Sequence, residues 1–152
     1  MNTAKPPAAD LRLVVGYDGS PPSARALDAA VSLLRGRAGG IEVTYVAHLP
    51  SMAALSAGAI GEMETDFDDI ERELRGMAGE QLAGREERWV LQRRQGPIVE
   101  ELLAAAKDAA TAHADATVVI VVGSSSQVTH RVLGSVAVGL ARHSPVPLII
   151  VP

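Results

Sequence analysis

The amino-acid sequence predicts an α/β protein that consists of one open parallel β-sheet with helices on both faces. Short apolar runs alternate with longer segments of helical periodicity, and each of these segments is long enough to return the chain to a parallel neighbour. The apolar run that precedes the last helix does not alternate with polar residues, which is typical of a strand buried on both faces. The 152 residues, 47% of them hydrophobic, suffice for a single domain with a substantial core.

The first part of the chain predicts a strand, a helix and a second strand. Residues 11–16 form a short apolar strand, and Ser20 can cap a helix that has prolines in its first turn. Apolar residues recur every three or four positions in this helix, which is expected to run to about Arg37. The Gly39-Gly40 pair is expected to end it, and residues 41–47 form the second strand.

The middle of the chain predicts a connection, a charged helix and an edge strand. Residues 49–61, rich in Ser, Ala and Gly, are expected to form a connection that is either mobile or a cover over a site, and we favour the mobile connection. Residues 62–88 are expected to be helical, with acidic side chains first and arginines later, an order that complements the helix dipole. Thr65 and Asp68 have the spacing of a capping box, so the acidic cluster favours a solvated helix start over a metal site. Residues 87–95 form a half-exposed or edge strand.

The last third of the chain predicts two helices and two strands. A helix begins at Gly96-Pro97 and ends near Ala114. The following residues 116–122 form a strand in the centre of the sheet. Residues 134–143 form the last helix, and residues 148–151 form the fifth strand.

Two loops at strand carboxyl ends are candidates for one ligand site. In open parallel sheets, ligands bind beyond the carboxyl ends of the strands. The fourth strand breaks at residues 123–126, and Gly134-Ser135 opens the next helix, so backbone N–H groups and a positive helix end meet in a place that suits phosphate. The loop at residues 16–20 can share this site. Taken alone, such Gly and Ser clusters are more often ordinary strand-to-helix loops.

Composition argues against several classes of partner and chemistry. Only four aromatic residues and a net charge of −4 argue against a nucleic-acid partner. The lack of cysteine excludes disulfides and thiolate chemistry and fits a reducing compartment. The apolar run at residues 11–15 is too short for a signal-peptide core or a membrane span, so we expect a soluble, cytoplasmic protein without a membrane partner.

The sequence also lacks the motifs of several common enzyme classes. It contains no G-x-S-x-G elbow, no G-x4-G-K-[S/T] loop and no G-x-G-x-x-G fingerprint. A hydrolytic triad, a P-loop ATPase and a dinucleotide oxidoreductase are therefore disfavoured. No catalytic residue is assigned, and we expect at most a weak ATPase.

Four segments of the chain resemble the universal stress protein family. They are VVGYDGS at residues 14–20, VGSSS at 122–126, LGSVA at 133–137 and PVPLIIV at 145–151. The similarity extends from about Leu11 to Pro152, which leaves residues 1–10 as a flexible tail. The resemblance implies a five-stranded sheet of order 3-2-1-4-5, like that of the adenine nucleotide alpha-hydrolases, and a homodimer paired through the last strand. The apolar terminal strand favours the same dimer, because an exposed apolar edge invites pairing with a copy of itself.

The resemblance also implies a ligand, because one subgroup of the family binds ATP or AMP, for which Mg²⁺ is a candidate companion. Asp18 would then contact the ribose and Val46 the adenine. The motif G-x-x-G-x9-G-[S/T] wraps the phosphates in that subgroup, and it matches Gly123, Gly134 and Ser135. The residues expected around the nucleotide are Gly16, Tyr17, Asp18, Val46, Val122, Gly123, Ser125, Ser126, Gly134, Ser135 and Val136.

Two departures from the family motif leave the function open. Ser126 stands where the motif has its second glycine, which can cost on the order of 1 kcal/mol if a positive φ is needed there. Residues 127–133 are seven where the motif has nine, although nearby hydroxyls, His130 and Arg131 offer other contacts. One hypothesis is a nucleotide-binding regulatory module of the stress response. The alternative is a nucleotide-free dimeric interaction protein, and slow ATP hydrolysis is a third, less favoured reading because no base or lysine lies beside the phosphate loop.

Overall fold

The computed structural model describes residues 9–48, 57–84, 88–124 and 134–152 of the chain, and these residues form alternating strands and helices. Five parallel strands form one sheet in the order β3-β2-β1-β4-β5, as predicted. The elements are β1 (Leu11–Gly16), α1 (Pro21–Leu34), β2 (Gly39–Ala47), α2 (Ala57–Gln81), β3 (Trp89–Gln95), α3 (Ile98–Ala112), β4 (Thr117–Gly123), α4 (Ser135–His143) and β5 (Leu148–Val151).

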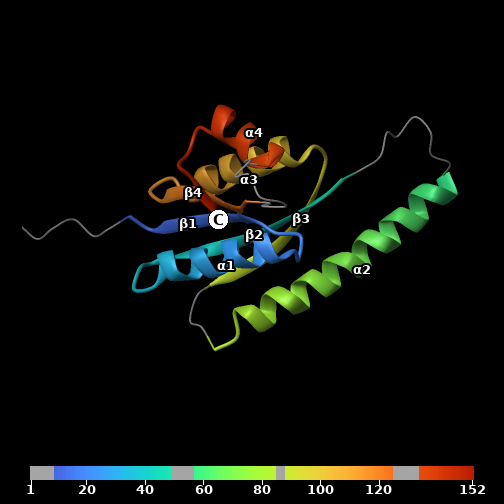
Figure 1. Cartoon of the computed structure of the whole chain (residues 1–152), viewed down its shortest axis with the longest axis horizontal. Helices are drawn as coiled ribbons and strands as arrows, with labels where there is room; N and C mark the ends of the chain where they lie inside the picture. The colour runs from blue at the N-terminus through green and yellow to red at the C-terminus, as the bar shows by residue number, and fades with distance from the viewer. Residues whose placement is uncertain (1–8, 49–56, 85–87, 125–133) are drawn as a thin grey trace, which may run out of the picture.

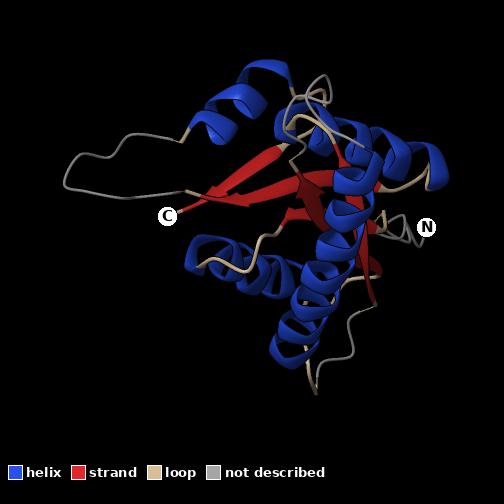
Figure 2. Ribbon diagram, turned by 90° about the vertical axis from the view of Figure 1, so that its right-hand side faces the viewer, coloured by secondary structure: helices blue, strands red, loops and turns tan. Residues whose placement is uncertain are grey.

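The helices cover the two faces of the sheet in pairs. Figure 1 shows α1 and α2 on one face and α3 and α4 on the other, and Figure 2 shows the strands enclosed between them. Alternate residues of each strand enter separate cores, so that Leu13 and Val15 of β1 face α1 while Val14 faces α3. Val14 and Ile120 are fully buried, because β1 and β4 lie in the middle of the sheet. None of the described helices is long and apolar enough to cross a membrane.

The first helix is shorter than predicted. It ends at Leu34 rather than near Arg37, because the chain turns at Gly36, which has a φ of +72°. Gly39 and Gly40 belong to β2 and do not end the helix. A Cβ at Gly39 would lie 1.9 Å from the carbonyl oxygen of Leu11, so the close pairing of β1 with β2 requires glycine there.

The long helix α2 is displaced from its predicted bounds at both ends. It begins at Ala57, so the predicted connection is shorter than residues 49–61, and residues 49–56 lie outside the described part of the chain. It ends at Gln81 instead of Arg88, before Gly84 adopts a φ of +70°. Thr65 lies inside the helix, where its hydroxyl donates to the carbonyl of Gly61 at 3.1 Å, and the predicted capping box is therefore wrong.

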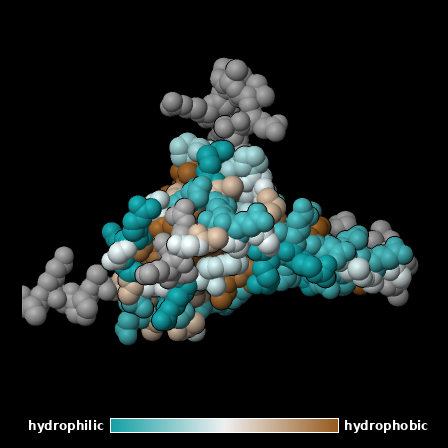
Figure 3. Space-filling model, turned by 90° about the horizontal axis from the view of Figure 1, so that it is seen from below, coloured by the Kyte–Doolittle hydropathy of each residue, from teal (hydrophilic) through white to brown (hydrophobic). Residues whose placement is uncertain are grey.

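Carboxylates of α2 tie this helix to the edge strand β3. Arg93 lies 2.6 Å from Asp68, 3.4 Å from Glu64 and 3.7 Å from Glu71, measured between nitrogen and oxygen atoms. The part of α2 that extends beyond the sheet is mostly hydrophilic on the face seen in Figure 3. Part of the acidic cluster therefore belongs to an ion-pair network. Within the described residues, no group of three or more His, Asp or Glu side chains could hold a metal ion.

Candidate nucleotide site at the carboxyl ends of the strands

A cavity of about 280 Å³ opens at the carboxyl ends of β1, β2 and β4. Its walls come from the loop after β1, the ends of β2 and β4, and the first turns of α1, α3 and α4. The lining residues are Gly16, Tyr17, Asp18, Ser20, Pro22, Ser23, Thr44, Val46, Ile98, Leu102, Val122, Gly123 and Val136. The cavity therefore occupies the position that ligands take in open parallel sheets.

The loop after β1 is organised around the carboxylate of Asp18. One oxygen of this carboxylate accepts hydrogen bonds from the backbone N–H of Ser20 at 3.0 Å and from its hydroxyl at 2.5 Å. Ser20 is also the N-cap of α1, where its hydroxyl oxygen accepts from the N–H of Ser23 at 3.4 Å. Gly19 turns the chain with a φ of +78°, and Leu74 of α2 lies so close that a Cβ would be 2.8 Å from it. The loop therefore holds a carboxylate in a set position.

The hydrogen bonds of this loop keep Asp18 ionised. Partial burial of the carboxyl group would raise the pKa of Asp18, but the hydrogen bonds from Ser20 and Ser23 outweigh burial, and the pKa lies below its ordinary value. The residue as a whole stays exposed at the cavity wall. At neutral pH, the site thus presents a negatively charged acceptor that suits the hydroxyl groups of a ligand.

The end of β4 makes close backbone contact with the start of α1. A Cβ at Gly123 would lie 2.2 Å from the carbonyl oxygen of Pro22, so no side chain fits at this position. A Cβ at Gly16 would lie 3.2 Å from Val122 and 3.4 Å from Leu102, which is a tight fit. The two glycines thus keep the backbone open where the strands meet the cavity.

The opposite wall of the cavity is largely apolar and comes from β2, α3, β4 and α4. Its apolar side chains are those of Val46, Ile98, Leu102, Val122 and Val136. Thr44 is 1% exposed, and its hydroxyl oxygen has no hydrogen-bond partner within the described residues. A cavity with one charged side and one apolar side suits a ligand that carries a flat apolar ring and a hydroxyl-bearing part.

Two helices begin at this cavity without a side-chain cap. No described side chain caps the N-terminus of α3, whose N-cap is Pro97, or that of α4, whose N-cap is Gly134. Ile98 and Val136 from the first turns of these helices line the cavity. Helix N-termini carry free N–H groups and partial positive charge, which favour an anionic group of a ligand.

The structure gathers most of the residues expected around a nucleotide. Gly16, Tyr17, Asp18, Val46, Val122, Gly123 and Val136 all line the cavity. Ser135 lines an adjoining hollow of about 730 Å³ instead, and Gly134 precedes it as the N-cap of α4. Ser125 and Ser126 lie outside the described residues.

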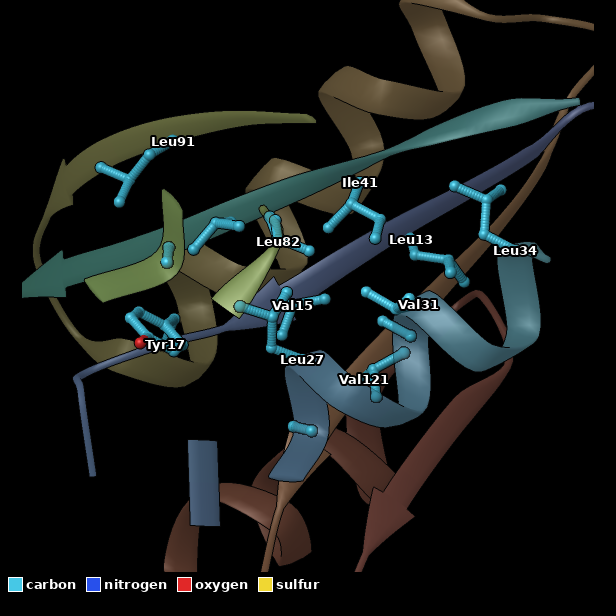
Figure 4. Close-up of a cluster of buried hydrophobic side chains, with 14 of the residues drawn as sticks. Leu13, Val15, Tyr17, Leu27, Val31, Leu34, Ile41, Leu82, Leu91 and Val121 are labelled. Carbon is cyan, nitrogen blue, oxygen red and sulfur yellow. The ribbon is translucent and has the colours of Figure 1, made fainter. Parts of the chain in front are cut away.

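Tyr17 belongs to the hydrophobic core as well as to the cavity wall. Its side chain is 4% exposed and packs in the core between the sheet and the pair α1 and α2, as Figure 4 shows. Burial, followed by the charges of Asp18 and Asp28, raises the pKa of the Tyr17 hydroxyl. We therefore count Tyr17 as a core residue that also borders the cavity.

The sequence did not predict five of the lining residues, which are Pro22, Ser23, Thr44, Ile98 and Leu102. Ser20 belongs to the loop at residues 16–20 that was expected to share the site, although it was not among the residues expected around the nucleotide. For the residues at the start of α1 a signal existed, since Ser20 was predicted to cap that helix beside the proposed site. For Thr44, the alternation of β2 places it on the same face as Val46. Ile98 and Leu102 carry no such signal, because only the packing of α3 on the sheet brings them to the cavity.

Comparison with known proteins agrees with this architecture. The model of the family described as "Universal stress protein family" matches residues 11–152. No curated protein matches the chain. The fold is similar to the structure of the hypothetical protein MJ0577, with a TM-score of 0.76, 16% identity and coverage of 92% of this chain and 94% of that one.

Two further similar structures contain nucleotides. One is a universal stress protein in complex with cAMP, with a TM-score of 0.65, 25% identity and coverage of 95% of this chain and 99% of the other. The second is an Arabidopsis thaliana protein of the universal stress protein family with AMP bound, with a TM-score of 0.63, 12% identity and coverage of 93% and 90%.

Proposed function

The chain belongs to the universal stress protein family, and on this basis we propose that it is a regulatory module of the stress response that binds an adenine nucleotide. The ligand would occupy the cavity at the carboxyl ends of the strands. The observation that carries the proposal is the pairing of an ionised, fixed Asp18 with an apolar wall in one cavity of about 280 Å³. The proposal includes no catalytic step.

Each side of the cavity suits one part of the ligand. The Asp18 carboxylate would accept hydrogen bonds from the ribose hydroxyls, and Val46 with its apolar neighbours would contact the adenine. Gly123 and the uncapped N-terminus of α4, with Gly134 and Ser135, would face the phosphate. Two proteins of similar fold contain cAMP and AMP, which favours an adenine nucleotide with few phosphates. ATP with Mg²⁺ is a second candidate ligand of larger size.

The test is calorimetric titration of the full chain with AMP, cAMP, and ATP with Mg²⁺. We expect saturable binding of at least one nucleotide, weakened at least tenfold in Asp18→Ala. Asp28→Ala is the matched control, because Asp28 is an exposed carboxylate on α1 that does not line the cavity. Binding that is equal in both variants would argue against the assigned site.

The second candidate is a nucleotide-free interaction protein of the same fold. The observation in its favour is the sequence between Gly123 and Gly134, where Ser126 replaces the second glycine of the family motif and the following stretch is two residues short. Absence of heat with all three nucleotides, in a sample whose circular dichroism shows a folded protein, would support this candidate over the first.

We also propose that the chain acts in the cytoplasm as a homodimer paired through β5. This strand bonds to β4 on one side, and its apolar side chains are half-buried. The carbonyl of Pro147 accepts a hydrogen bond from Ile120 of β4, and that of Val151 accepts one from Ser124 just after β4. Because the backbone groups of successive residues in a strand point to opposite sides, those of Ile150 face the free edge. We expect a dimer by light scattering and a folded monomer for Ile150→Pro, since proline removes an N–H from that edge.

A further inference from the structure

A second cavity lies at the other end of the sheet, beside the amino ends of β1 and β2. It has a volume of about 670 Å³, and four arginines line it. We call Arg12, Arg35, Arg37 and Arg88 the arginine basin. Asp10 is the one carboxylate among the lining residues. The whole chain has a net charge of −4, so the basin is a local concentration of positive charge.

Arg12 is a partly buried member of the basin. Its side chain is 25% exposed, and its Nε atom is buried without a hydrogen-bond partner in the described structure. Its ion pair with Asp10 spans 3.7 Å and involves a carboxylate that is half exposed. Arg12 therefore keeps hydrogen-bonding capacity that the neighbouring residues do not satisfy.

Gly40 leaves the space that the Arg12 guanidinium occupies. The two residues are partners in the pairing of β1 with β2. A Cβ at Gly40 would lie 3.0 Å from Nη1 of Arg12 and 3.1 Å from the carbonyl oxygen of Arg88. A side chain here would crowd the guanidinium, so the glycine at this position supports the basin.

Arg12 and Arg88 also line an adjoining cavity of about 440 Å³ between the sheet and α3. In that cavity the third arginine, Arg94, is bound at 2.5 Å to Asp108. Glu42 also lines that cavity, so two carboxylates accompany its arginines, whereas Asp10 is the one carboxylate that lines the basin.

Three of the four basin arginines have no acidic partner within the described residues. Arg35, Arg37 and Arg88 form no ion pair with any residue that the structure describes. Four arginines elsewhere each have a carboxylate oxygen within 2.8 Å, namely Arg72, Arg75, Arg93 and Arg94. Among the described residues, these ion pairs lie away from the basin, where Asp10 is the one lining carboxylate.

The dipole of α1 accounts for part of the basin only. Arg35 and Arg37 follow the last turn of α1, where cations complement the negative helix end. Arg12 lies on β1, and Arg88 directly precedes β3. Helix capping does not explain these two residues.

We propose that the arginine basin binds a small molecule that carries two or more oxyanion groups. Guanidinium groups bind phosphates and carboxylates through paired hydrogen bonds, and a ligand with several such groups can contact more than one arginine at once. The basin and the proposed nucleotide cavity share no lining residue, so the two proposals stand independently.

The test uses two probes of this chemistry, inorganic tripolyphosphate and citrate, titrated into the full-length chain. Binding is followed by calorimetry and by amide shifts in nitrogen-15 NMR spectra. We expect saturable binding of at least one probe, with shifts at Gly39 and Gly40 and none at Gly16 and Gly123. Binding of tripolyphosphate alone identifies phosphate as the group recognised, and binding of citrate alone identifies carboxylate.

Removing a positive charge and removing a negative charge from the basin should change the affinity for the probes in opposite directions. Arg12→Gln with Arg88→Gln should weaken binding at least tenfold, and Asp10→Asn should strengthen it severalfold because it removes the competing carboxylate. Arg142→Gln, which changes an exposed arginine in the last turn of α4, should leave binding unchanged. If the double variant fails to fold, the exposed Arg37→Gln replaces it, with a smaller loss expected.

Three outcomes would overturn the proposal. They are no saturable shift at Gly39 and Gly40 with either probe, binding that the arginine variants do not weaken, and shifts confined to the carboxyl-end cavity. The last outcome would assign the probes to the nucleotide site and leave the proposed function standing.

Discussion

The sites proposed at the two ends of the sheet differ in the groups that would hold a ligand. At the carboxyl end, the cavity combines a carboxylate that the backbone of its own loop holds with two helix N-termini that no described side chain caps. At the amino end, strands and loops supply guanidinium groups beside the C-terminus of α1. Parallel winding creates this difference, because all helices of such a fold run antiparallel to the strands. Under these proposals, helix N-termini would face the anionic part of a ligand at the carboxyl end, whereas arginine side chains would do so at the amino end.

Gly123→Ala should cause the largest loss of unfolding free energy, because it disrupts the backbone contact on which the carboxyl-end cavity depends. The added Cβ would meet the carbonyl of Pro22 at 2.2 Å, and overpacking of this kind costs about 3 kcal/mol of unfolding free energy. Gly76→Ala is the control, since no atom lies within 4 Å of a Cβ there and the change should stabilise α2 by about 0.5 kcal/mol. Urea denaturation measures both, and equal stability of the two variants would contradict the close contact.

Ser20→Ala should have the next largest effect, again at the carboxyl end. It removes the cap of α1, at a cost of about 1 kcal/mol, and the hydrogen bond that the Ser20 hydroxyl donates to Asp18. The backbone bond can persist, so the pKa of Asp18 should rise part of the way to its ordinary value. Because the folded-state pKa is lowered, Asp18 stabilises the wild-type protein above its unfolded pKa, and this stability is lost as the pH falls through the folded pKa. NMR titration of the Asp18 carboxyl carbon checks the shift, and an unchanged pKa would count against the loop network.

Substitution of one paired and one unpaired arginine tests whether the basin arginines contribute to the stability of the fold. Arg93→Ala should cost about 0.5 kcal/mol, because it breaks three ion pairs between β3 and α2, and the loss should shrink in high salt. Arg37→Ala removes an arginine without an ion pair in the described structure and should leave the unfolding free energy nearly unchanged. A larger loss for Arg37→Ala in the same denaturation series would mean that the basin serves folding.

Glu42→Gln should change the stability least. The contribution of Glu42 to stability should have the opposite pH dependence to that of Asp18. Burial raises the pKa of Glu42, with Arg94 opposing and Asp108 adding to the shift. A raised folded pKa gives stability that is present below the unfolded pKa and is lost as the pH rises through the folded pKa. Glu42→Gln should therefore be slightly more stable than wild type at pH 7 and lose this advantage near pH 4. Thermal melts across this range provide the measurement, and an advantage that grows in acid would refute the assignment.

The sequence was sufficient to predict the order and type of every element, because the strands and helices differ clearly in the period of their apolar residues. Helix ends were harder to predict. α2 begins at Ala57, before the acidic cluster, and the local sequence does not predict this start because two of the residues 57–61 are glycine. Carboxylates of the cluster pair with Arg93, which no local pattern reveals. The order of the strands came from the resemblance to a family, and the parallel pairing of the described strands confirms it.

The candidate site likewise contains some residues that the sequence could predict and others that it could not. Asp18 and Gly123 could be predicted from short motifs, because Gly123 ends β4 and Asp18 follows closely after β1, where the role of each residue depends on the local backbone. Thr44, Ile98 and Leu102 belong to the cavity through tertiary packing. The arginine basin is an extreme case, since Arg12 and Arg88 are far apart in the sequence and β2 lies between their strands.

The contact between Gly123 and Pro22 has a mechanical consequence. Pro22 lies in the first turn of α1, and Arg35 lies directly after its last residue. A helix of 14 residues is a stiff rod about 21 Å long. The contact between Gly123 and Pro22 thus ties one end of α1 to the tip of β4, while the other end lies beside Arg35, which lines the arginine basin. A single helix therefore spans the distance between the two proposed sites.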